Sequence, residues 1–272
     1  MNKVSLYVYY DENYGTSWVG HDKAREIVEY LKNYQFKEVD AKRLSKVMSD
    51  AVQRGLAARE TVVVFSLDVV PDTVVDNPSS PSSNSLFRKF LNVGNTIIWI
   101  GDIPLCYVGT PERKITLGNQ AQQAVLGLNP NVSTLPEPGK LVRLTLHGLL
   151  FGLPSWQGIR PTQRPTSTPP YFINLAFSLP EQQIHAYIAT YIPGEALSGF
   201  IRIYDFNIGK LRKLDEALLE GIVNIAFRNP LRFLRQRIDQ LSIRIEALKS
   251  ELDSLGPKLD EILSILKSQQ QR

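Results

Sequence analysis

The chain of 272 residues has one cysteine, Cys106, and three histidines. A single cysteine excludes an internal disulfide and every zinc site built on cysteine pairs. The histidines, His21, His147 and His185, are too far apart in sequence to act as paired metal ligands on one helix. Neither of the common glycine-rich phosphate loops occurs. We therefore expect no metal and no cofactor.

Long apolar runs are also missing. No stretch reaches the eighteen or more apolar residues that a membrane-spanning helix needs. The first residues lack the apolar core and the small-residue cleavage site of a signal peptide. A hydrophobic content of 43% is ordinary for a globular protein with a core. These features predict a soluble cytoplasmic protein with no membrane partner.

Positive charge is concentrated in one region. Residues 1–209 are nearly balanced, with 19 basic and 18 acidic residues, whereas residues 210–237 hold 7 basic and 3 acidic residues. The basic residues are Lys210, Arg212, Lys213, Arg228, Arg232, Arg235 and Arg237. Such a region can contact the phosphates of a nucleic acid or an acidic protein surface. The simpler explanation is a solvated helix surface.

Short apolar segments alternate with helical patterns over the first hundred residues. Strands are predicted at 3–10, 37–40, 61–67 and 95–100, and helices at 21–34, 41–56 and 86–93. Further strands at 184–192 and 199–204 and a helix at 215–227 complete the pattern. The alternation predicts one α/β domain over residues 1–228, with a flavodoxin-like, doubly wound and mainly parallel sheet.

Ligands of doubly wound proteins bind beyond the carboxyl ends of the strands. Asp11, Asp68 and Asp102 follow three of the predicted strands, and the irregular segment 152–170 adds Trp156 and Arg160. We predict that these five residues line a ligand pocket. Paired carboxylates are also suited to acid–base catalysis, and Asp102 has the alternative task of capping the backbone N–H groups that follow it.

The order of the predicted elements resembles the class I glutamine amidotransferase-like fold, in particular its trehalose-utilisation (ThuA-like) branch. The resemblance covers most of residues 1–228. It is carried by the strand end Tyr10-Asp11-Glu12, the strand end Val64-Phe65-Ser66-Leu67, the helix and glycine turn at 86–95, and Trp99-Ile100-Gly101-Asp102-Ile103-Pro104.

In active members of that superfamily, the turn after the central strand carries a cysteine nucleophile, which a downstream histidine and glutamate assist. The corresponding turn here offers Asp102, and Cys106 comes four residues later, beyond Pro104. Asp102 and Cys106 are the remaining catalytic candidates. Since a lone cysteine is normally a small core residue, the resemblance implies a head domain without amidotransferase activity, a pseudoenzyme.

The last forty residues carry an unbroken heptad pattern. Apolar residues recur there in alternating steps of three and four: Leu231, Leu234, Ile238, Leu241, Ile245, Leu248, Leu252, Leu255, Leu259, Ile262 and Leu266. This pattern predicts a coiled-coil segment over 229–272, rather than a helix that lies on its own domain. Gly256-Pro257 interrupts the run, and proline inside a helix predicts a kink or break at 256–257.

The residues beside the heptad stripe restrict the pairing. In a parallel homodimer, Arg244 would face Lys249 of the second helix, which is unfavourable. An acidic partner helix, an antiparallel pairing or a phosphate surface avoids this repulsion.

The sequence therefore favours a non-catalytic assembly subunit that docks through its C-terminal helix. One alternative is a small-molecule sensor that uses the strand-end pocket. A second is a nucleic-acid-associated accessory protein, for example in a defence complex, and a third is a hydrolase or amidotransferase.

Overall fold

The computed structural model describes residues 4–58, 61–128, 135, 138–162, 171–179, 183–193, 197–228, 238 and 241–257. The chain divides into two compact units, Met1–Pro230 and Leu231–Arg272. The first unit is called the head here and the second the tail.

The head is built on an eight-stranded sheet with the order β2-β1-β3-β5-β13-β12-β11-β9. Its first five members, β2 (Lys37–Val39), β1 (Ser5–Tyr9), β3 (Thr61–Phe65), β5 (Thr96–Ile100) and β13 (Gly199–Ile203), are parallel. β12 (Gln183–Thr190), β11 (Tyr171–Ser178) and β9 (Arg143–Leu144) continue the sheet in antiparallel fashion. The prediction of a mixed α/β domain with a large, mainly parallel sheet is confirmed.

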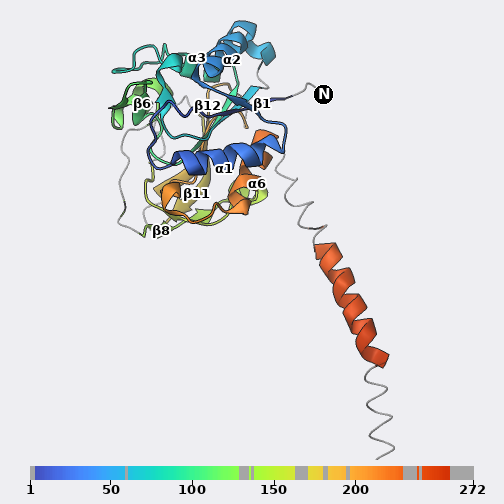
Figure 1. The fold of residues 1–272 in the computed structure, drawn as a ribbon. Helices are drawn as coiled ribbons and strands as arrows, with labels where there is room; N and C mark the ends of the chain where they lie inside the picture. The colour runs from blue at the N-terminus through green and yellow to red at the C-terminus, as the bar shows by residue number, and fades with distance from the viewer. Residues whose placement is uncertain are drawn as a thin grey trace, which may run out of the picture. The chain divides into compact units, whose positions relative to one another are not determined.

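Helices cover both faces of the sheet (Figure 1). α1 (His21–Lys32) and α6 (Glu216–Ala226) contact each other on one face, and α2 (Ala41–Arg54) and α3 (Leu86–Asn92) contact each other on the opposite face. α2 begins after Asp40, which accepts a hydrogen bond from Arg43 N at 2.7 Å and so caps a free backbone donor. Asp215 caps α6 in the same way, through Ala217 N at 2.8 Å.

An aromatic cluster fills the space between the sheet and α3. Phe65 on β3 lies 5.5 Å from Trp99 on β5 and 5.6 Å from Phe87 on α3, measured between ring centroids. Phe200 on β13 extends the cluster, 6.1 Å from Phe87. Because these side chains are fully buried, they fix β3, β5 and β13 against the same helix.

Smaller elements surround the sheet. A three-stranded sheet consists of β4 (Val70–Pro71), β6 (Tyr107–Gly109) and β7 (Lys114–Thr116), and a two-stranded sheet of β8 (Lys140–Leu141) and β10 (Gln157–Gly158). The short helices are α4 (Gln120–Leu126), α5 (Leu146–Leu150), η1 (Gly55–Ala58), η2 (Asp72–Val74) and η3 (Ile208–Lys210). No helix among the described residues is long and apolar enough to span a membrane.

The described residues of the tail are 238 and the helix over 241–257 (Figure 1). Helical conformation includes Gly256 and Pro257. The kink or break predicted at 256–257 stays a prediction, because the residues that follow lie outside the described part.

Candidate functional site

Four neighbouring parallel strands of the head lead into aspartates. Asp11 follows β1, Asp68 follows β3, Asp102 follows β5 and Asp205 follows β13. Since these strands are neighbours in the sheet, the four aspartates lie along its carboxyl edge. This is the edge at which doubly wound proteins bind ligands.

Asp68 binds backbone N–H groups from two different segments. Its carboxylate accepts hydrogen bonds from Ser17 N at 3.2 Å, Trp18 N at 2.9 Å and Val19 N at 3.3 Å. It also accepts from Asp102 N at 3.0 Å. Asp68 thereby ties the segment between β1 and α1 to the turn that follows β5.

The two aspartates are packed so closely that the turn after β5 needs glycine. Gly101 has φ of 99°, and a Cβ atom there would lie 2.9 Å from Asp68 Oδ2. Burial raises the pKa of Asp68 to about 6; the backbone hydrogen bonds oppose this rise, and the charge of Asp102 adds to it.

Arg160 approaches Asp102 from the segment between β10 and β11. Its Nη1 atom lies 3.5 Å from Asp102 Oδ1, and its guanidinium group lies 4.8 Å from the centroid of the Trp18 ring. Asp102 also accepts hydrogen bonds from Ser17 Oγ at 3.2 Å and Ile103 N at 2.7 Å. Among the predicted pocket residues, the structure thus brings Asp68, Asp102 and Arg160 together.

Asp11 lies apart from this group. It accepts a hydrogen bond from Ala41 N at 3.1 Å at the start of α2. It lines a cavity of about 570 Å³ together with Asn13, Tyr14, Asp40, Ala41, Lys42, Thr73 and Pro111. This cavity lies between the ends of β1 and β2 and the small three-stranded sheet.

A buried Ser–His–Asp chain joins the ends of β11 and β13 to the start of β12. His185 near the start of β12 contacts Asp205 Oδ2 through Nδ1 at 2.8 Å and Ser178 Oγ through Nε2 at 2.9 Å. The order of these groups is that of a catalytic triad. All three side chains are 0% exposed, however, so a substrate cannot reach Ser178 in this conformation.

Asp205 also binds the segment 156–160, which covers the side chains of Ser178, His185 and Asp205. It accepts hydrogen bonds from Trp156 Nε1 at 2.8 Å and from Arg160 N at 2.7 Å. The predicted pocket residue Trp156 is therefore a buried anchor of the covering segment. The sequence pattern did not assign Ser178, His185 or Asp205 to a site, although Asp205 lies two residues after its strand, as Asp102 does.

Arg202 on β13 is a buried cation with unused donors. It lies in register between Trp99 on β5 and Tyr187 on β12, and its side chain is 0% exposed. Nη1 donates to the carbonyl of Arg160 at 2.7 Å. Within the described part of the chain, Nε and Nη2 of Arg202 and the hydroxyl of Tyr187 have no hydrogen-bond partner.

Cys106 is poorly suited to nucleophilic catalysis. The residue is 6% exposed. Burial raises the pKa of its thiol, and the charge of Asp102 adds to this rise. Because the thiolate is the reactive form, both effects disfavour the chemistry that an amidotransferase nucleophile needs.

The basic residues of 210–237 are spread over both ends of α6. Lys210, Arg212 and Lys213 are exposed before it, and Lys213 pairs with Glu216 at 3.2 Å. Arg228, beyond the other end, donates from Nη2 to Thr96 Oγ1 at 3.3 Å. Arg232, Arg235 and Arg237 lie outside the described residues.

The heptad residues that the structure describes are all exposed. They are Ile238, Leu241, Ile245, Leu248, Leu252 and Leu255, with exposed fractions between 49% and 70%. Leu234, Leu259, Ile262 and Leu266 lie outside the described residues.

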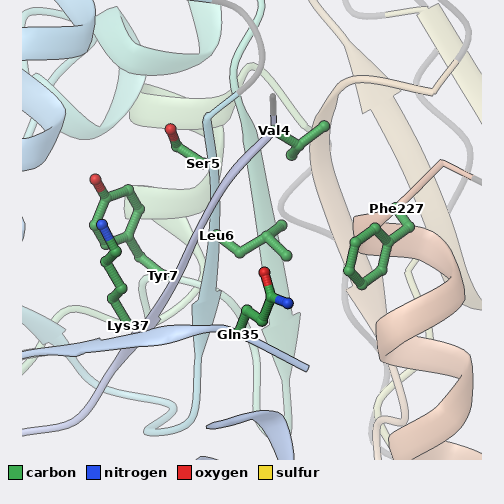
Figure 2. A pocket seen from close by; sticks show the side chains of 7 residues that line it. All are labelled: Val4, Ser5, Leu6, Tyr7, Gln35, Lys37 and Phe227. Carbon is green, nitrogen blue, oxygen red and sulfur yellow. The ribbon is translucent and has the colours of Figure 1, made fainter. Parts of the chain in front are cut away.

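A second cavity, of about 420 Å³, lies near the amino ends of β1 and β2 (Figure 2). Val4 and Leu6 point to the side of β1 on which Phe227 lies, whereas Ser5 and Tyr7 point to the other side. Gln35 and Lys37 complete the lining. Among the described residues, no group of three or more histidine, cysteine, aspartate or glutamate side chains could hold a metal ion.

The chain matches a family model and a relative over most of its length. The model of the MJECL34 family covers residues 4–229. A Methanocaldococcus jannaschii protein, described as "Uncharacterized protein MJECL34", is 36% identical over 285 residues, which span 98% of this chain and 93% of the relative. The chain therefore belongs to the MJECL34 family. A span of 98% requires the alignment with the relative to include most of the tail, beyond the end of the family model.

Replacing Asp68 by asparagine should change how stability depends on pH. The pKa of Asp68 is about 6 in the folded protein, against an ordinary value of 3.8 for an aspartate. Its contribution to stability is therefore full below about pH 4 and is lost as the pH rises through 6. Since asparagine does not ionise, the advantage of the wild type over Asp68→Asn should shrink as the pH rises from 4 to 7. Thermal unfolding across this range tests it, and an advantage that grows with pH contradicts it.

Replacing Gly158 by alanine should disrupt the Ser–His–Asp chain. A Cβ atom at Gly158 would lie 2.0 Å from His185 Nδ1 and 2.8 Å from Asp205 Oδ1. Overpacking of this kind should lower the free energy of unfolding by at least about 2 kcal/mol in a denaturant titration. Gly15→Ala is the matched control, because its nearest neighbour would be 3.4 Å away. Equal stabilities of the two variants would refute the expectation.

Proposed function

We propose that this MJECL34-family protein is a non-catalytic assembly subunit, whose head is held in a complex through its C-terminal helix. The observation that carries the proposal is the exposed stripe on the helix of 241–257. Leu241, Ile245, Leu248, Leu252 and Leu255 recur at heptad spacing and are between 49% and 70% exposed. Contiguous apolar surface of this kind marks a site of protein association.

The energetics favour a covered stripe. Full burial of a leucine or isoleucine side chain stabilises by roughly 1.5–3 kcal/mol, so covering five half-exposed side chains contributes several kcal/mol. A single helix of this length is marginally stable in water. A partner helix would supply both the burial and the stability.

The head supports the non-catalytic part of the proposal. Ser178 is fully buried, and Cys106 has a raised pKa and little exposure. The parallel strand order β2-β1-β3-β5-β13 corresponds to the flavodoxin-like order. The sharp turn at Gly101, followed by Asp102 in place of a nucleophile, is consistent with an amidotransferase-like pseudoenzyme. A role in nucleic-acid binding has less support, because the basic residues are divided between the two ends of α6.

A charge placed in the stripe should release the partner. Ile245→Glu puts a carboxylate at a core position of the heptad, where burial without a counter-charge is costly. Ile243→Glu is the matched control, since Ile243 is 66% exposed and lies off the stripe. Tagged full-length protein is purified from its native host, and the co-purifying protein, including untagged copies of this chain, is quantified.

We expect Ile245→Glu to remove the co-purifying protein and Ile243→Glu to retain it, while both heads unfold at the wild-type temperature. Identical co-purification with the two variants would contradict an assembly function of the helix.

A second candidate function is the binding of a small carboxylate or similar anion at the carboxyl edge. The specific observation is the unused Nε–Nη2 edge of Arg202. Because Arg202 is 0% exposed and donates to the carbonyl of Arg160, an anion reaches this edge only when the segment around Arg160 moves away. This edge matches the two oxygens of a carboxylate, and the hydroxyl of the neighbouring Tyr187 is a further unused donor. A buried cation without such a partner is costly.

Acetate is a suitable probe of this site. At equal ionic strength, acetate should raise the unfolding temperature of the wild type above its value in chloride, because a ligand that binds the folded state stabilises it. Arg202→Met should lose this difference, and the exposed control Arg113→Met should keep it. A wild type that does not distinguish acetate from chloride excludes carboxylate binding at this site.

A further inference from the structure

The tail has an exposed apolar stripe, and the charged residues beside this stripe distinguish between the possible arrangements of a partner helix. Heptad position a is occupied by Ile238, Ile245 and Leu252, and position d by Leu241, Leu248 and Leu255. Arg244 and Glu251 flank the stripe at position g, and Ser242 and Lys249 at position e. All of these residues are exposed on the helix, so they can contact a second helix.

A parallel arrangement of two copies brings like charges together. Position g of one helix then faces position e of the next heptad on the other helix. Arg244 would face Lys249 of the second copy, and the symmetry of the dimer repeats this contact. Glu251 would face Gly256, so no attractive pair offsets the repulsion.

An antiparallel arrangement places g opposite g and e opposite e, and pairs each a residue with a d residue. Two registers bury the same number of apolar layers over the heptad run. In the first, Ile245 lies opposite Leu248 of the second copy, and Leu241 lies opposite Leu252. In the second, which is shifted by one heptad, Leu248 lies opposite Leu252 and Ile245 lies opposite Leu255.

The charges distinguish these registers. The first sets Arg244 against Glu251 of the second copy, and symmetry produces this attractive pair twice near the centre of the coil. Lys249 then faces the uncharged Ser242. The shifted register sets Glu251 against Glu251 and Lys249 against Lys249, which is repulsive at both positions. Over the whole heptad run, the first register also sets Arg237 against Lys258, whereas the shifted register sets Arg244 against Lys258. Only the first register therefore contains an attractive pair of charges beside the apolar layers.

We infer that the partner of the tail is a second copy of this chain, paired antiparallel with Ile245 opposite Leu248. This inference rests on the proposed assembly function and names its partner. Glu251, one heptad after Arg244 in the same chain, is the acidic side chain with which Arg244 of the second copy pairs. Self-complementarity of this kind is the property of a two-fold symmetric interface.

Disulfide crosslinking tests orientation and register together. Cys106 is buried and 6% exposed, so the full-length wild type serves as the background and as the control that should not crosslink. Leu241→Cys is made on a chain with an enlarging tag, and Leu252→Cys on an untagged chain. The proteins are mixed under reducing conditions and then oxidised.

The inferred register predicts a disulfide between the tagged and the untagged chain. Each variant oxidised alone should stay uncrosslinked, because residues 241 of the two copies would be about 16 Å apart along the helix axis. Disulfides within Leu241→Cys alone would show a parallel coil and overturn the inference. The shifted register also fails to crosslink the mixed pair, so a dimer without the mixed disulfide overturns the register.

Light scattering of the purified wild type separates this inference from the proposed function. The inference requires a dimer that Ile245→Glu dissociates and Ile243→Glu retains. A monomeric wild type overturns self-pairing. If Ile245→Glu then still removes a different co-purifying protein from the host, the assembly function survives with another partner; if it removes none, both fail.

Discussion

Hydrogen bonds to two buried carboxylates hold the segments that cover the carboxyl edge of the head. Asp68 binds the segment after β1, and Asp205 binds the segment from Trp156 to Arg160. A buried carboxylate is stable only when its oxygens accept several donors. Each aspartate meets this requirement with groups from more than one segment, so the edge keeps its arrangement only while all of these segments are in place.

This constraint explains the contrast between the two ends of the chain. The carboxyl groups of the head that could serve chemistry are largely occupied by internal contacts, as Asp68 and the Ser178–His185–Asp205 chain show. The tail has the opposite character, because its apolar stripe finds no cover within its own described helix. The tail and the unused donors of Arg202 are therefore the two places proposed for interaction with another molecule.

The sequence predicts those features that depend on local pattern. The apolar runs of β3 and β5 and the helical spacing in α1, α2 and α6 identified these elements close to their observed bounds. β11 escaped prediction, since its residues alternate less clearly and follow a proline-rich segment. The short α4 and α5 carry too few periodic residues to be recognised from spacing.

Contacts between residues that follow neighbouring parallel strands could be predicted, because such residues meet at one edge of the sheet. Contacts that depend on how antiparallel strands pair with one another could not be predicted. Asp68 and Asp102 follow neighbouring strands, so their proximity could be expected. Asp11 lies at the same edge, but its carboxylate accepts a hydrogen bond from Ala41 N in the first turn of α2 and so lies apart from Asp68 and Asp102. The contact of His185 with Ser178 and Asp205 depends on the pairing of β11, β12 and β13, which spacing along the chain does not reveal.

The position of β13 has a consequence for synthesis on the ribosome. This strand lies between β5 and β12, yet it follows both in the chain. Until residues 199–203 have emerged, the fully buried β5 exposes an unpaired edge that can bind other nascent chains. The tail emerges after every strand of the sheet, so the segment proposed for assembly becomes available only once the whole head has been synthesised.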